Sequence, residues 1–88
     1  MSFKYEISDK LKRILNKLES KDRILSIAVN KKIKQIINSD IDSINRFKNL
    51  KGNMSHLKRV HIGSFVLLFQ VKGNKIFFES FVHHDRAY

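Results

Sequence analysis

Residues 59–82, RVHIGSFVLLFQVKGNKIFFESFV, carry the clearest structural pattern in the sequence. The centre of this stretch, residues 65–71, is a nearly continuous apolar run, as expected for a central strand that is buried on both faces. Gly63-Ser64 precedes this run and residues 72–75 follow it, and both segments have the composition of tight turns. Residues 76–82 then read as a further strand. The stretch therefore predicts a three-stranded antiparallel meander.

The first strand of this meander carries two basic side chains. Val60 and Ile62 alternate with Arg59 and His61. Because successive side chains of a strand point to opposite faces, Arg59 and His61 are expected on the same face of the sheet.

Toward the N-terminus, the spacing of apolar residues changes from that of strands to that of helices. Residues 3–7 alternate with period two and predict a short strand, and Ser8 is a suitable helix N-cap. Apolar residues then recur at helical spacing in 11–18 and again in 25–37, with only a brief break between the two segments. Two helices joined by so short a link are expected to form an antiparallel hairpin. The polar segment 39–46 reads as a loop.

The order strand, two helices, meander predicts an α+β fold with the helices on one face of a twisted sheet. Eighty-eight residues make a single domain, 1–88. The chain has no cysteine, which excludes disulfides, a thiol nucleophile and Cys-based metal sites. No apolar stretch reaches the ~18 residues that a membrane span needs, and the N-terminus does not resemble a signal peptide, so we expect a cytoplasmic protein.

Charge is the strongest global signal. Eighteen Lys and Arg residues against eight Asp and Glu give a net charge of +10. Such an imbalance favours a polyanionic partner: nucleic acid, an anionic membrane surface or an acidic protein.

Candidate catalytic groups gather near the C-terminus. If the strands pair in sequence order, the tail that carries His83, His84, Arg86 and Tyr88 lies near the strand of Arg59 and His61, and these groups share one basic concavity. Imidazoles serve as acid and base near neutral pH, and guanidinium groups hold phosphate oxygens. This set fits metal-free RNA cleavage, in which a 2′-hydroxyl attacks the adjacent phosphate.

Other chemistries are less well supported. Glu79 and Asp85 are the only acids after residue 47, so the two-carboxylate plan of sugar hydrolysis is weak. The chain has neither a Gly-x-Ser-x-Gly elbow nor a glycine-rich phosphate loop. A metal site at His83 and His84 is disfavoured because neighbouring residues of an extended chain point to opposite sides. We therefore expect no metal and no cofactor.

A family resemblance sharpens this reading. The segment 57–69, LKRVHIGSFVLLF, resembles the central hairpin of RelE/ParE-superfamily toxins, and the tail 83–88, HHDRAY, resembles their C-terminal motif of a His or Arg pair followed by Tyr. Ile7-Ser8 before a Lys- and Leu-rich helix and Leu50-Lys51-Gly52 before the hairpin agree with it. The resemblance spans the whole chain and implies a RelE-like microbial RNase fold.

The resemblance also implies a function. It indicates the toxin of a type II toxin–antitoxin pair: an mRNA interferase, that is, a metal-independent endoribonuclease that cleaves mRNA on the ribosome. The expected partners are the ribosome-bound message and an acidic, RelB-like antitoxin that forms a hetero-oligomer with the toxin, with no membrane involved. The residues implied as catalytic are Arg59, His61, His83, His84 and Tyr88, and those implied as RNA-binding are Lys51, Lys58, Arg59 and Arg86.

One position departs from the family pattern. Val66 stands where many RelE-like members carry an arginine, so one expected cation is missing. Three alternatives therefore stay open: a ParE-like toxin that binds DNA gyrase without cleaving RNA, a catalytically decayed toxin that binds only its antitoxin or RNA, and an RNA- or ribosome-binding domain without a reaction.

Overall fold

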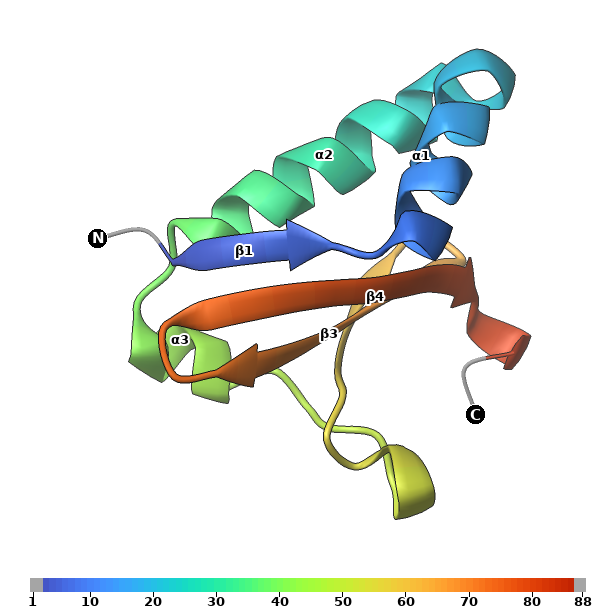
Figure 1. Cartoon of the computed structure of the whole chain (residues 1–88). Helices are drawn as coiled ribbons and strands as arrows, with labels where there is room; N and C mark the ends of the chain where they lie inside the picture. Colours follow the sequence, from blue (N-terminus) through green and yellow to red (C-terminus); the bar gives the residue numbers. More distant parts are fainter. Residues whose placement is uncertain (1–2, 87–88) are drawn as a thin grey trace.

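The computed structural model describes residues 3–86, and these residues form one four-stranded sheet with helices on one side (Figure 1). The elements in chain order are β1 (Lys4–Ile7), α1 (Asp9–Lys21), α2 (Arg23–Ile37), α3 (Ile41–Asn45), the 3₁₀ turn η1 (Gly52–Met54), β2 (Lys58–Ile62), β3 (Phe65–Lys72), β4 (Lys75–His83) and the 3₁₀ turn η2 (His84–Arg86). The α+β class predicted from the sequence is confirmed.

The sheet has the strand order β1-β4-β3-β2. Strands β2, β3 and β4 form the predicted antiparallel meander, and the turns between them contain Gly63 and Gly73, with φ of 61° and 59°. The first strand completes the sheet in a way that the sequence did not predict. It lies parallel to β4, from the pair Lys4–Lys75 to the pair Ile7–Phe78, so the sheet is mixed.

The two long helices cover one face of the sheet (Figure 1). Asp22 alone separates them: it ends α1 and caps α2, and its carboxylate accepts a hydrogen bond from the Leu25 amide at 3.1 Å. Leu11 of α1 and Val29 and Ile36 of α2 are fully buried against the apolar side chains of β3 and β4. The predicted pair of helices with a short connection is confirmed.

A short helix, α3, occupies the segment for which the sequence predicted a loop. Asp40 caps it by accepting a hydrogen bond from the Ser43 amide at 2.8 Å, and Ile44 is fully buried in the main core. The bonds from the Ser43 amide and hydroxyl hold the pKa of Asp40 below its usual value of 3.8. Because the pKa is lower in the folded state, ionised Asp40 favours folding above that value, and this contribution disappears as the pH falls through the folded-state pKa.

A β-bulge in β4 connects the sheet to the start of α1. Leu68 pairs with Ser80 and Phe69 pairs with Phe78, which leaves Glu79 as the extra residue. The Ser8 hydroxyl donates a hydrogen bond to the Glu79 carbonyl at 2.7 Å and accepts one from the Leu11 amide at 3.0 Å. One side chain thus caps α1 and satisfies the backbone of the bulge.

We predict that Ser8→Ala lowers the free energy of unfolding by about 1–2 kcal/mol, because it removes a helix cap and leaves a part-buried carbonyl without its donor. Urea denaturation measures this change. Ser20→Ala is the matched control, since the Ser20 hydroxyl makes an exposed bond within α1 to the Lys17 carbonyl; a shift within about 0.5 kcal/mol is expected there. Equal losses in the two variants would contradict the dual role of Ser8.

Candidate active site

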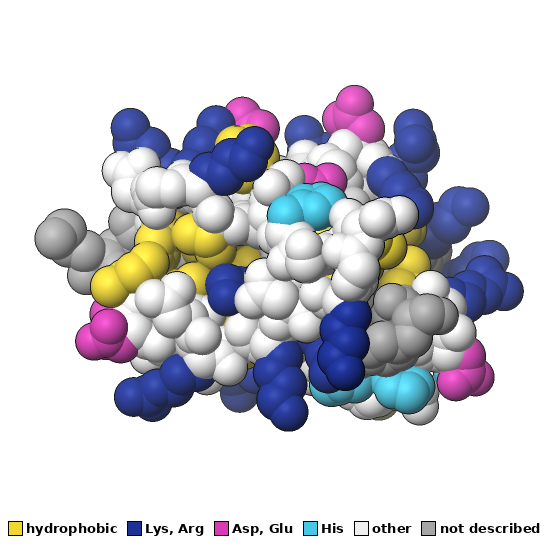
Figure 2. All heavy atoms as spheres, turned by 90° about the horizontal axis from the view of Figure 1, so that it is seen from below, with side chains coloured by type: hydrophobic (Ala, Val, Ile, Leu, Met, Phe, Trp, Pro, Cys, Tyr) yellow, Lys and Arg dark blue, Asp and Glu magenta, His cyan; other side chains and the backbone are white. Residues whose placement is uncertain are grey.

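The face of the sheet opposite α1 and α2, here called the open face, is only partly covered. Segment 46–57 crosses it and places Leu50 and Leu57 over Val66 and Leu68 of β3, with Val82 of β4 beside them. This second apolar cluster is separate from the main core. Figure 2 shows this side of the molecule, with Lys and Arg side chains around much of its rim and histidine side chains in two places, above the centre and at the lower right.

Two histidines from distant parts of the chain meet on the open face. His61 of β2 pairs with Val66 of β3, which in turn pairs with Val82 of β4. His84, the first residue of η2, directly follows β4, and its ring lies beside that of His61. Their ring centroids are 5.4 Å apart. The His84 amide donates a hydrogen bond to the Ser64 carbonyl at 2.9 Å, which ties the chain end to the turn between β2 and β3.

His83 lies on the opposite side of the sheet. It pairs with Phe65, whose side chain packs against the main core, and its ring meets the Phe65 ring edge-on at 5.3 Å. The two tail histidines therefore do not face the same space, although both side chains are about half exposed, at 44% and 51%.

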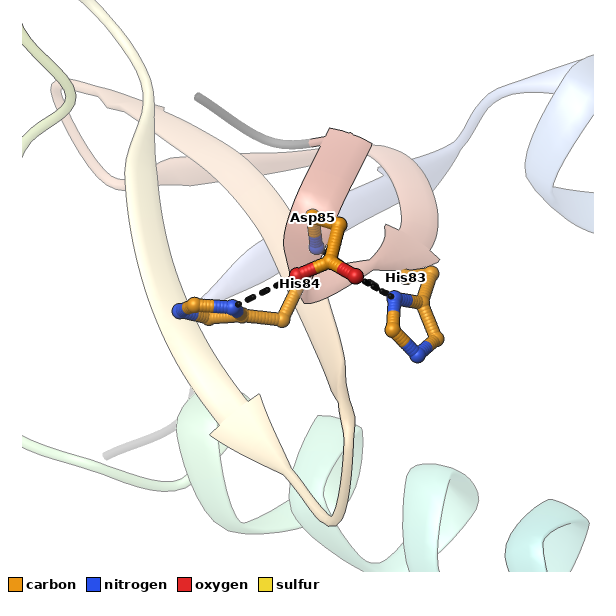
Figure 3. A network of polar contacts seen from close by, with 3 residues as sticks. All are labelled: His83, His84 and Asp85. Atoms are coloured by element: carbon orange, nitrogen blue, oxygen red, sulfur yellow. Dashed lines mark hydrogen bonds and ion pairs between the residues drawn. The ribbon is translucent and has the colours of Figure 1, made fainter.

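Asp85 lies between the two tail histidines (Figure 3). Each of its carboxylate oxygens is 3.6 Å from one Nδ1 atom, that of His83 on one side and that of His84 on the other. The Asp85 amide also donates a hydrogen bond to His83 Nδ1 at 3.3 Å.

The cations predicted for the site lie in different settings. Arg59 pairs with Leu68, so it lies on the open face with His61, and the two line a shallow hollow together with Arg46 and Lys48. Arg86 lies in η2, close behind His84, and lines a second hollow that contains Leu68 and Val82.

The two predicted lysines lie away from the histidine pair. The Lys58 ammonium donates hydrogen bonds to the Phe47 carbonyl at 3.3 Å and to Asn49 Oδ1 at 3.1 Å, so it holds segment 46–57 against the edge of β2. Lys51 is exposed at the start of η1. Tyr88, predicted as catalytic, lies outside the described residues.

Ser64 and Glu79 were not predicted from the sequence as site residues. Ser64 contributes its carbonyl to the anchoring of His84, and Glu79 reaches the open face only because of the bulge. The residue types Ser and Glu do not by themselves predict these roles, because both roles depend on how β4 pairs with the neighbouring strand.

Within residues 3–86 no group of three or more His, Cys, Asp or Glu side chains is arranged to hold a metal ion. In the same part of the chain, no helix combines the length and the apolar character that crossing a membrane requires.

Comparison with known proteins identifies relatives in two archaea. The chain is 41% identical over 83 residues to an uncharacterised protein of Methanosarcina mazei, covering 86% of this chain and 95% of that protein. It is 37% identical over 89 residues to "Putative toxin RelE4" of Methanocaldococcus jannaschii, covering 98% of this chain and 90% of that one. No family model matches the sequence.

Solved structures with the same fold share little sequence with this chain. YafQ of Escherichia coli superposes with a TM-score of 0.73 at 11% identity, over 98% of both chains. The toxin–antitoxin complex RelBE2 of Mycobacterium tuberculosis gives 0.69 at 15% identity, over 94% of this chain and 99% of the other. The ParDE toxin–antitoxin system of Pseudomonas aeruginosa gives 0.68 at 12% identity, over 93% and 96%.

We predict that Leu57→Ala destabilises the protein by about 2–4 kcal/mol, because Leu57 is 5% exposed and anchors segment 46–57 on the open face. Met54→Ala is the control from the same segment, since Met54 is 44% exposed, and its effect should stay below about 1 kcal/mol. Urea denaturation gives the two values. Comparable losses would mean that Leu57 does not fasten this segment to the sheet.

Proposed function

The chain belongs to the RelE/ParE superfamily of toxins, and on that basis we propose that it is a ribosome-dependent endoribonuclease, the toxin of a type II toxin–antitoxin pair. The observation that supports this proposal is the pair of His61 and His84 on a basic, solvent-accessible face, with ring centroids 5.4 Å apart. Two imidazoles at this spacing can serve the attacking and the leaving oxygen of one phosphodiester.

The proposed reaction is transesterification of the message. The 2′-oxygen forms a bond to the adjacent phosphorus, the bond from phosphorus to the 5′-oxygen breaks, and the products are a 2′,3′-cyclic phosphate and a 5′-hydroxyl. One imidazole of the pair removes the 2′-proton, and the other protonates the leaving oxygen. No metal or cofactor takes part.

The remaining residues are proposed to bind and orient the message. The Arg59 and Arg86 guanidinium groups stabilise the charge that develops on the phosphate, which a Val at position 66 cannot do. Tyr88 is proposed to stack on a base, as the family resemblance implies. Lys51 and Lys58, which lie away from the histidine pair, are proposed to attract the message through their positive charge. His83 is proposed to act through Asp85, which it shares with His84.

We predict that His84→Ala lowers the rate of mRNA cleavage by about 10²–10⁴-fold, as expected for loss of a general acid or base. His83→Ala should reduce the rate by less than about tenfold, because His83 lies on the other side of the sheet. Growth arrest on expression and primer extension on cellular messages measure these effects, and His56→Ala, an exposed site on segment 46–57, is the control. Undiminished cleavage by His84→Ala would refute the assignment.

A ParE-like toxin that acts on DNA gyrase is the second candidate. Val66 favours it, because this residue is fully buried in the second apolar cluster and supplies no cation to the open face. The same expression experiment separates the two: codon-positioned cuts in messages identify the nuclease, and gyrase-linked DNA breaks identify the alternative. Salt-dependent ribosome binding with intact messages would instead indicate a binding domain or a decayed toxin.

The partner proposed for regulation is an acidic antitoxin. The net charge of +10 favours association with an anionic chain. Helix α2 adds an apolar anchor, since Ile24 and Ile27 are 85% and 58% exposed on its outer side.

We predict that the double change Ile24→Gln and Ile27→Gln weakens binding of the antitoxin encoded beside this gene by about tenfold or more, through loss of buried apolar area. The change should leave mRNA cleavage intact, because α2 covers one face of the sheet (Figure 1) and the histidine pair lies on the open face. Calorimetry on the purified pair at two salt concentrations measures the affinity. Unchanged affinity would place the antitoxin elsewhere.

A further inference from the structure

A second hollow lies on the open face beside the histidine pair. It has a volume of about 330 Å³. Leu57, Leu68 and Val82 supply apolar walls, and Lys10 and Arg86 also line it. Since Val82 precedes His84 by two residues of strand, the hollow begins within about 7 Å, along the chain, of the residues proposed to cleave RNA.

The hollow contains a polar group without a partner. Ser80 is 8% exposed, and within residues 3–86 its hydroxyl makes no hydrogen bond. A buried hydroxyl left unpaired is unfavourable, so such groups in native proteins call for an explanation. Ser80 lines the hollow, and its hydroxyl oxygen is covered in the free protein, so a bound ligand can supply the missing partner once the Ser80 side chain rotates toward it.

The bulge places an acceptor next to this hydroxyl. Glu79 and Ser80 are consecutive, yet both line the hollow, because the extra residue in β4 turns Glu79 toward the open face. Glu79 Oε1 accepts a hydrogen bond from Gln70 Nε2 at 2.9 Å, which orients the carboxylate. Among residues 3–86 no hydrogen bond to Oε2 is present, so this oxygen can accept one from a ligand donor.

From these groups we infer that the hollow binds one nucleobase of the RNA, and that it selects bases with an exocyclic amino group. This inference rests on the proposed function. Adenine, cytosine and guanine each carry such an amino group as a donor for Glu79, whereas uracil offers only carbonyl oxygens at the corresponding position. The Ser80 hydroxyl serves as donor or acceptor to the same base edge.

The charges within the hollow favour a base over an acidic peptide. Glu79 repels a carboxylate that enters between the apolar walls, while Lys10 and Arg86 attract the phosphates that flank a base. The hollow thus suits one nucleotide of a single strand, because it has apolar walls, a few polar groups and basic residues around it.

The test uses trinucleotides of 2′-O-methyl A, C or U, which cannot be cleaved because the attacking hydroxyl is blocked. We expect the wild-type protein to bind the A and C trinucleotides about tenfold more tightly than the U trinucleotide. NMR amide shifts on binding should include those of Leu68, Ser80 and Val82. Glu79→Gln and Ser80→Ala should reduce the A-over-U preference to less than about threefold, whereas Ser20→Ala, on the far end of α1, should retain it.

Equal affinity for the three trinucleotides, absence of saturable binding, or base-dependent shifts confined to other residues would overturn the inference. So would competition by a short polyglutamate peptide that shifts the same three amides, which would assign the hollow to an acidic partner. These outcomes can be distinguished from failure of the proposed function. Base-selective binding without cleavage of unmodified messages refutes only the nuclease activity. Cleavage of messages together with an unchanged base preference in Glu79→Gln and Ser80→Ala refutes only the base-binding site.

Discussion

The structure depends on the burial of β3 on both faces. Four consecutive residues of this strand, Val66 to Phe69, are at most 4% exposed, so apolar groups must cover the sheet from either side. The helices and α3 cover Leu67 and Phe69, whereas Leu50 and Leu57 of segment 46–57 cover Val66 and Leu68. This second cover is narrow and leaves His61 and, just beyond the end of β4, His84 accessible to solvent. The location of the candidate site is thus a consequence of unequal covering of the two faces.

The presence of valine at position 66 is connected with the apolar residues that cover it. An arginine at this position would place a charge beneath Leu50 and Leu57, where no acidic side chain belongs to the cluster, and burial of an unpaired charge is strongly unfavourable. In this chain the positive charge near the histidine pair comes instead from the edge strand, through Arg59, and from the tail, through Arg86. The departure from the family pattern at residue 66 therefore has a packing cause, and it shifts the cations from the centre of the open face to its margins.

Local sequence patterns predicted most helices and strands well. They predicted less well which of these elements lie next to one another in the fold. The apolar run 65–71, the turn glycines and the Ser8 cap are determined by nearby residues, and each is observed as expected. Alternation also predicted that Arg59 and His61 share a face, and that His83 and His84 do not. In contrast, the parallel pairing of β1 with β4 and the bulge at Glu79 depend on residues some seventy and ten positions away. The short helix α3 was missed because its single buried residue, Ile44, shows no periodicity within five residues.

The pairing of the first strand with the last has a consequence for biosynthesis. Lys4 pairs with Lys75, so the sheet cannot be completed until the residues of β4 have left the ribosome. Until then, the apolar sides of α1 and α2 have no sheet to pack on, and the nascent chain is exposed to aggregation and to proteases. Loop closure over such a separation also slows folding. The histidine pair, whose second member follows β4, therefore forms only after the residues of β4 have been synthesised and have paired with β3.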